Sequence, residues 1–274
     1  MTLLIQISDT HFGTERAPVV DALVRMVREQ VPALVVLSGD ITQRARRAQF
    51  RAARAFVDRL GVPVTLAIPG NHDIALYNVA TRLFMPYANH RHAFGHELEP
   101  EFESDSLLVV TVNTTRVYLH ENGAVSPAQI ERVARRLARA GEAQLRIVVT
   151  HQPVCVTRLQ DRHDLLRGHE QAVRRWSAAG ADLILGGHIH LPFVKALHEC
   201  HAGLPRRVWA VQAGTAVSAR VRHEAGNSVN LIRSLAGEAP RRCVVERWDF
   251  QAPTQRFAPV AVDELNFDAD SHAR

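Results

Sequence analysis

Six short runs of apolar residues punctuate the chain and predict buried β-strands. Each run is rich in Val, Ile and Leu and lacks polar alternation, a pattern typical of strands that are buried on both faces. The runs cover residues 3–8, 33–38, 63–68, 107–112, 145–150 and 181–186. Strands of this kind occur in parallel sheets that are covered by helices.

Between these runs, apolar residues recur at helical spacing and predict amphipathic helices. One helix follows Pro18, which suits a first helical turn, and a second includes Phe50 on its apolar side. A third has a clear start, since Ser126 and Gln129 match a capping box with Pro127 just inside it. The alternation of strands and helices predicts an α/β layered fold.

Residues 86–105 interrupt this rhythm. The segment contains two prolines and three histidines, His90, His92 and His96. These histidines could bind a further metal ion, but we favour a polar loop that runs over the surface beside a pocket.

The last part of the chain predicts a different kind of sheet. Shorter runs at 207–214, 227–235 and 242–250 indicate antiparallel strands that complete a second sheet. No repeat or linker divides the chain, so we expect one domain over residues 1–262. The polar stretch 263–274 is expected to be a loose tail.

Composition and charge narrow the class of protein. The 274 residues are 46% hydrophobic and 22% charged, as in ordinary globular proteins. A net charge of +5 suits an anionic substrate without demanding one, and no basic block points to nucleic acid as a partner. Five arginines within residues 43–56 could form an anion patch, but we favour the solvated face of a helix.

The cysteines and apolar segments give expectations about location. Cys155, Cys200 and Cys243 are odd in number and form no C-x-x-C pair, which predicts reduced thiols in a cytoplasmic protein, with Cys155 packed in the core. We expect no signal peptide, no membrane-spanning helix and no membrane partner, because the N-terminal apolar run is short and none approaches 18 residues. The oligomeric state stays open, a homodimer included.

Polar side chains follow five of the six apolar runs, at the point where each predicted strand ends. In open α/β sheets, ligands bind in the crevice outside the carboxyl ends of the strands. Imidazole, carboxylate and amide groups are all able to ligate metal ions. The candidate ligands are Asp9, His11, Asp40, Asn71, His151, His188 and His190.

The number and spacing of these residues favour two metal ions. D-x-H and H-x-H spacing places both side chains on the same side of an extended segment. Seven ligands are too many for one small transition-metal ion, but they suit two ions that share a bridge. A carboxylate can bridge with one oxygen on each ion, and Asp40 is our candidate. Each motif alone could be a polar turn, whereas five in succession argue against coincidence.

In chain order the motifs read SDTH, SGD, PGNHD, THQP and GGHIH, and this set resembles the calcineurin-like metallophosphoesterases. The resemblance runs from Ser8 to His190, with weaker similarity in VQAGTAVSAR up to about residue 220. It implies a four-layer α/β/β/α sandwich with a dinuclear metal site at the carboxyl ends of the strands. It also implies that His72 is catalytic without being a ligand, and we expect Asp73 to make a structural hydrogen bond.

The resemblance further implies how the ligands divide. One ion would be held by Asp9, His11 and His190, and the other by Asn71, His151 and His188. Asp40 would bridge the two ions.

Departures from other branches of the family narrow the function. GDITQRA and PGNHD differ from the GDxVDRG and RGNHE of protein phosphatases, and Gln43 stands where purple acid phosphatases have a ligating tyrosine. The GDLFD motif of repair nucleases is also missing. What remains resembles the bacterial class III cyclic-nucleotide phosphodiesterases and glycerophosphodiesterases, as do VNTT at 112–115 and SPAQIERVARRL at 126–137.

The resemblance therefore predicts a metal-dependent phosphodiesterase for small diesters, with 3′,5′-cyclic nucleotides such as cyclic AMP favoured. A hydroxide bridging two ions of Mn²⁺, Fe²⁺ or Zn²⁺ would attack phosphorus, and His72 would stabilise or protonate the leaving alkoxide. Asn113, Arg116 and His120, after the fourth run, would contact the substrate or else only begin a loop.

Two alternatives stay open. One is a broader phosphodiesterase or phosphomonoesterase for glycerophosphodiesters or lipid-precursor pyrophosphates. The other is a non-catalytic scaffold of the same fold, which the presence of all seven ligands and His72 disfavours.

Overall fold

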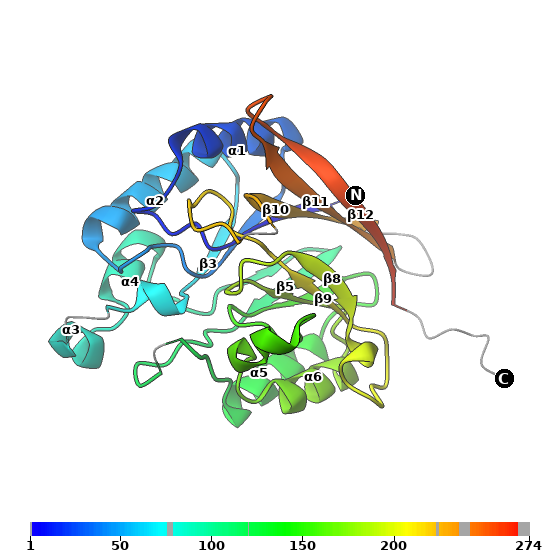
Figure 1. Cartoon of the computed structure of the whole chain (residues 1–274). Helices are drawn as coiled ribbons and strands as arrows, with labels where there is room; N and C mark the ends of the chain where they lie inside the picture. The colour runs from blue at the N-terminus through cyan, green and yellow to red at the C-terminus, as the bar shows by residue number, and fades with distance from the viewer. Residues whose placement is uncertain (1, 76–78, 120, 223–224, 236–241, 268–274) are drawn as a thin grey trace.

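The computed structural model contains two six-stranded sheets that face each other and are covered by helices on their outer sides (Figure 1). It describes residues 2–75, 79–119, 121–222, 225–235 and 242–267. The result is a four-layer α/β/β/α sandwich, as the family resemblance implied.

The first sheet joins the N-terminal strands to the C-terminal ones. Its strands β1, β2 and β3 are parallel, whereas β10, β11 and β12 are antiparallel to their neighbours. In spatial order the strands are β12 (Arg256–Asn266), β11 (Arg242–Gln251), β10 (Ser228–Leu235), β1 (Thr2–Ile7), β2 (Leu34–Ser38) and β3 (Thr65–Ile68).

The second sheet is built from the middle of the chain. Its strands β5, β6, β7 and β9 are parallel, and β4 and β8 lie antiparallel at the two edges. In spatial order the strands are β4 (Glu101–Glu103), β5 (Leu107–Thr111), β6 (Leu145–Val149), β7 (Leu183–Gly186), β9 (Trp209–Gln212) and β8 (Phe193–Ala196).

Helices cover the outer face of each sheet (Figure 1). The longer helices are α1 (Ala17–Gln30) and α2 (Arg47–Leu60) on the first sheet, and α5 (Pro127–Leu137) and α6 (His169–Ala178) on the second. The predicted cap of α5 is confirmed, because the backbone N–H of Gln129 donates to Ser126 Oγ at 3.2 Å. Two shorter helices are α3 (Val79–Phe84) and α4 (Ala88–Phe94), and short 3-10 segments span Asn71–Asp73, Leu159–Asp164 and Leu197–Glu199.

Three apolar layers explain why the strand runs are continuous. On β1, Leu3, Ile5 and Ile7 pack against α1 and α2, while Leu4 points into the layer between the sheets. On β5, the alternation is the same, with Leu108 packing toward α5 and α6. Strands β1 and β5 therefore bury both faces, which is what the apolar runs predicted.

The later strands partly depart from prediction. The antiparallel strands β10, β11 and β12 are present, but they extend the first sheet instead of completing the second. The run at 207–214 forms β9 in the second sheet, where it is antiparallel to β8, as predicted, but parallel to β7. Strand β12 also continues past residue 262 to Asn266, because Leu265 and Phe267 pack between the sheets. Residues 268–274 lie outside the described part.

The segment 86–105 is also more ordered than predicted. It contains α4 and β4, and α4 packs beside α2. His90 is completely buried against Phe50 and Phe94, so it does not belong to a surface loop. His92 and His96 are exposed, as expected.

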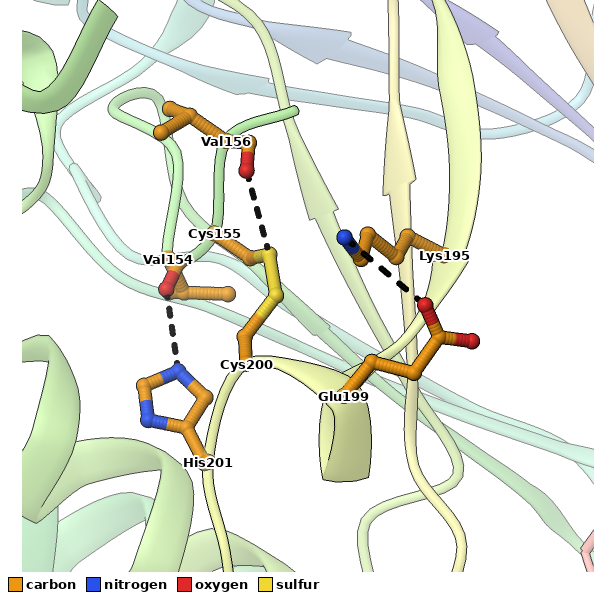
Figure 2. Close-up of a disulfide and its surroundings, with 7 residues drawn as sticks. All are labelled: Val154, Cys155, Val156, Lys195, Glu199, Cys200 and His201. Carbon is orange, nitrogen blue, oxygen red and sulfur yellow. Dashed lines mark hydrogen bonds and ion pairs between the residues drawn. A yellow bond between two sulfur atoms is a disulfide. The ribbon is translucent and has the colours of Figure 1, made fainter. Parts of the chain in front are cut away.

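The expectation of three reduced thiols is wrong in this structure. Cys155, in the loop after β6, forms a disulfide with Cys200, which follows the 3-10 turn Leu197–Glu199 (Figure 2). The two loops meet in space although 45 positions separate the cysteines. His201 contacts the Val154 carbonyl beside the bridge at 3.2 Å. Cys243 is a free, buried thiol whose pKa is raised by burial.

A search of the described helices finds none that is both long and apolar enough to span a bilayer.

Candidate metal centre

The predicted ligands meet where parallel strands of both sheets end. Asp9 and His11 follow β1, Asp40 follows β2, and Asn71 and His72 begin the 3-10 turn after β3. From the second sheet, His151 follows β6, and His188 and His190 follow β7. Asp9, His11 and His151 are each fully buried.

 

The side chains form two groups that share one carboxylate. In the first group, His190 Nε2 lies 3.2 Å from Asp9 Oδ1 and 3.0 Å from His11 Nε2. In the second, His151 Nε2 lies 3.3 Å from Asp40 Oδ1 and 3.3 Å from Asn71 Oδ1, and His188 completes the cluster. The other oxygen of Asp40 lies 3.7 Å from His11 Nε2, so this carboxylate faces both groups.

Hydrogen bonds to backbone carbonyls orient two of the imidazoles. His151 Nδ1 lies 2.9 Å from the Ser38 carbonyl, and His190 Nδ1 lies 2.7 Å from the Arg220 carbonyl. A carbonyl can only accept, so Nδ1 donates in both rings and Nε2 faces the cluster. Imidazoles whose Nδ1 proton is held in this way are typical metal ligands through Nε2.

His188 is held differently. Its Nε2 lies 3.4 Å from Asp164 Oδ1, on the 3-10 turn Leu159–Asp164. This contact leaves Nδ1 of His188 for the cluster. Asp164 was not anticipated from the sequence, because no motif marks it and 24 positions separate it from His188.

The backbone at the ligands is strained. Asp9, His11, Asp40, His188 and His190 all have positive φ, between 41° and 74°. Non-glycine residues rarely adopt this left-handed conformation, and such strain clusters at functional sites. Backbone bonds hold the strained loops together, including His11 N–H to the Asp40 carbonyl at 3.0 Å.

Two glycines permit the close approach of these loops. Gly39 has a φ of +98°, and a Cβ there would overlap the ring of His151. A Cβ on Gly70 would overlap the backbone and carboxylate of Asp40. The glycines of SGD and PGNHD are therefore required by packing as well as by turning of the chain.

Burial and charge act against each other in the cluster. Burial alone would raise the pKa of Asp9, but His190 beside it outweighs burial and lowers the pKa to about 2. Burial lowers the pKa of His11 to about 3. Burial would also lower the pKa of His151, but the adjacent Asp40 raises it to about 9. Burial alone would raise the pKa of Asp40 as well, but His151 and His72 outweigh burial and lower it. Asp9 and Asp40 are thus both held ionised, which suits a site for cations.

Asp73 has a structural role, as expected. Its carboxylate accepts hydrogen bonds from the amides of Gly70, Ile41 and Thr42 and from the Thr42 hydroxyl, at 2.7–2.9 Å. Burial and the nearby Asp40 raise its pKa to about 6. Asp73 therefore fastens the loop after β3 to the loop after β2.

A cavity of about 320 Å³ opens over the cluster. His72, Asn71 and Asp40 line it, together with Arg220 and Arg222 from the loop after β9. The arginines were not identified as site residues, although VQAGTAVSAR, which ends at Arg220, was the one later stretch with weak family similarity.

Two of the predicted substrate residues, Asn113 and Arg116, lie away from this cavity. Asn113 and Arg116 line a separate cavity of about 540 Å³ beside α4. Arg116 donates to the carbonyls of Asn113 and Thr115 and to Gln129 Oε1, at 2.5–3.0 Å. The structure does not bring these two residues to the metal cluster, so their contact with substrate stays a prediction. His120 lies outside the described residues.

A family model for calcineurin-like phosphoesterases matches residues 2–192, which is more than half of the chain. The chain belongs to this family. This phosphoesterase is a hydrolytic enzyme, and its clusters of His and Asp indicate a dinuclear site for divalent metal ions.

Similar proteins agree with this assignment. A probable cyclic nucleotide phosphodiesterase from Synechococcus is 26% identical over 216 residues, which cover 71% of this chain and 76% of that protein. A dimetal phosphatase from Danio rerio has a TM-score of 0.67 at 14% identity, over 97% of this chain and 98% of that one. The purple acid phosphatase PPD1 from yellow lupin has a TM-score of 0.70 at 10% identity, over 97% of this chain and 53% of that one. At these identities the two structures support the fold alone.

Proposed function

We propose that this phosphoesterase hydrolyses small phosphodiesters, with 3′,5′-cyclic nucleotides such as cyclic AMP as the favoured class. The observation that carries the proposal is Asp40, whose two oxygens face separate groups of histidines at 3.3 and 3.7 Å. One carboxylate between two ligand groups suits a pair of ions that act on one phosphate. The similarity to a probable cyclic nucleotide phosphodiesterase supports the choice of substrate.

The division of ligands follows the two groups. One ion would be held by Asp9, His11 and His190, the other by Asn71, His151 and His188, with Asp40 shared. Mn²⁺, Fe²⁺ and Zn²⁺ all suit this mixture of imidazole and carboxylate. When bound, the ions would supply Lewis acidity and lower the pKa of water.

His72 would act on the leaving group. Its Nδ1 lies 3.0 Å from the Gln43 carbonyl, which can only accept, so Nδ1 carries a proton and Nε2 faces the cavity. Its backbone N–H donates to Asp40 Oδ1 at 2.8 Å, which ties its position to the proposed bridge. In the doubly protonated form of the ring, Nε2 would donate its proton to the departing alkoxide.

Charge favours a diester over a neutral substrate. Asp9 and Asp40 contribute two negative charges, fewer than two divalent cations carry, so the loaded site would attract a monoanion. We also propose a cytoplasmic location, although disulfides such as Cys155–Cys200 are more common in oxidising compartments.

A substrate panel tests the proposal. Purified protein loaded with Mn²⁺ is assayed against cyclic AMP, bis(p-nitrophenyl) phosphate and p-nitrophenyl phosphate. We expect faster hydrolysis of the two diesters than of the monoester. A preference for the monoester would favour a phosphomonoesterase, and no hydrolysis by protein with two bound ions would favour a non-catalytic scaffold.

A further inference from the structure

The loop after β9 forms one wall of the metal cavity. Its backbone is fastened to the loop after β1: Ala216 N–H donates to the Ser8 carbonyl at 2.9 Å, and Thr215 Oγ1 donates to the Asp9 carbonyl at 2.6 Å. This wall lies beyond residue 192, where the match to the family model ends. The five motifs that contain the candidate ligands end at His190, so none of them includes this wall.

Arg220 projects from this wall onto His72. Its Nη1 lies 3.1 Å from His72 Nε2 and 3.2 Å from Gln43 Oε1. In the neutral ring, whose proton lies on Nδ1 against the Gln43 carbonyl, Nε2 accepts the hydrogen bond from Arg220. A fixed positive charge thus lies beside the atom that we place next to the leaving group.

The rest of the Arg220 guanidinium is open to a ligand. Among the described residues, neither Nε nor Nη2 of Arg220 has a hydrogen-bond partner. Arg222, which lines the same cavity, is committed differently, since it donates to Asp161 Oδ1 at 3.0 Å and to the Ile189 carbonyl at 3.1 Å. Of these two arginines, we therefore consider Arg220 as the one whose N–H groups can donate to a ligand.

We propose that Arg220 binds a non-bridging oxygen of the substrate phosphate, an inference that rests on the proposed function. Guanidinium groups donate two parallel hydrogen bonds to phosphate oxygens, which a single ammonium group cannot reproduce. The open Nη2 and Nε donors of Arg220 fit this role, and the cavity holds His72 beside them.

Binding of inorganic phosphate tests the proposal without turnover. Calorimetry measures its affinity for the Mn²⁺-loaded wild type, Arg220→Met and Arg220→Lys. We expect Arg220→Met to weaken binding by about 10- to 100-fold and Arg220→Lys to restore part of it. Metal content should stay at the wild-type level, because His190 is held by the backbone carbonyl of Arg220, which the substitution leaves in place.

Arg51→Met, on the exposed side of α2, is the matched control and should bind phosphate like the wild type. Wild-type affinity in Arg220→Met would overturn the proposal, as would loss of metal, which would show that the guanidinium supports the ligands instead. If the wild type binds phosphate through Arg220 but hydrolyses no diester, the proposed function fails and the phosphate site stands.

Discussion

The cavity over the metal cluster and the cavity beside α4 differ in a way that shows what marks a functional site. The second is larger, about 540 against 320 Å³, and it also contains arginine, histidine and carboxylate side chains. Its Arg116, however, donates hydrogen bonds to the carbonyls of Asn113 and Thr115 and to Gln129 Oε1. Over the cluster, the ligand atoms within each group of His and Asp residues lie within 4.8 Å of one another.

Buried histidines show the same contrast. His151 is fixed by a carbonyl on one nitrogen and faces carboxylate on the other. His90 is equally buried beside α2, yet neither of its ring nitrogens has a partner in the described structure. Convergence of oriented polar atoms therefore distinguishes the metal cluster, whereas cavity size and burial do not.

The largest expected effect is at the shared carboxylate. Asp40→Ala should abolish activity and weaken both metal ions, because one residue faces both ligand groups. Metal analysis and a diester assay measure the two losses. Asp58→Ala, at an exposed position on α2, is the control. An active Asp40→Ala protein with two full equivalents of metal would contradict the bridging role.

His72→Ala should lower the rate without removing metal. We expect a fall of about 10² to 10⁴, typical for loss of an acid–base group, with less loss on p-nitrophenyl diesters because p-nitrophenolate needs little protonation. His92→Ala, at an exposed site on α4, is the control. Equal loss on good and poor leaving groups, or loss of a metal ion, would argue against proton donation by His72.

In the α4 cavity, Arg116→Met should affect stability more than catalysis. Loss of its bonds to loop carbonyls should lower the free energy of unfolding by about 1–3 kcal/mol. We expect kcat/KM for bis(p-nitrophenyl) phosphate to change by less than about threefold. Arg135→Met, at an exposed position on α5, controls for loss of charge. A rise in KM for cyclic AMP alone would instead support the predicted substrate contact.

The smallest effect on activity is expected at His90. Burial lowers the pKa of His90 from 6.5 to about 4. Below pH 6.5 the unfolded chain therefore binds a proton that the folded chain excludes, and the stability from this group, present above pH 6.5, is lost as pH falls toward 4. The total loss is about 3 kcal/mol.

His90→Phe should remove this part of the pH dependence while leaving diester hydrolysis at the wild-type rate. Urea unfolding at pH 7, 5.5 and 4.5 compares the two proteins, and the wild type should lose more stability at each step. If the wild type and His90→Phe lose the same stability as the pH falls, His90 can be protonated in the folded protein and this prediction is wrong.

Local patterns in the sequence determined the strands, the helices and the order of the ligands. The apolar runs before Asp9, Asp40 and His151 predict the strands that end at the cluster, because buried parallel strands require continuous apolar residues. The cap at Ser126 likewise predicted the start of α5 from four adjacent residues.

Only the tertiary structure decided which distant segments meet. The pairing of Cys155 with Cys200, the contact of Arg220 with His72 and the burial of His90 against Phe50 all join parts of the chain that are far apart in sequence. Such contacts arise from the packing of layers and loops, and they leave no periodic trace in the sequence around either partner. The strand ends that carry the ligands could therefore be predicted from the sequence, whereas the position of the loop after β9, which lines the cavity above them, could not.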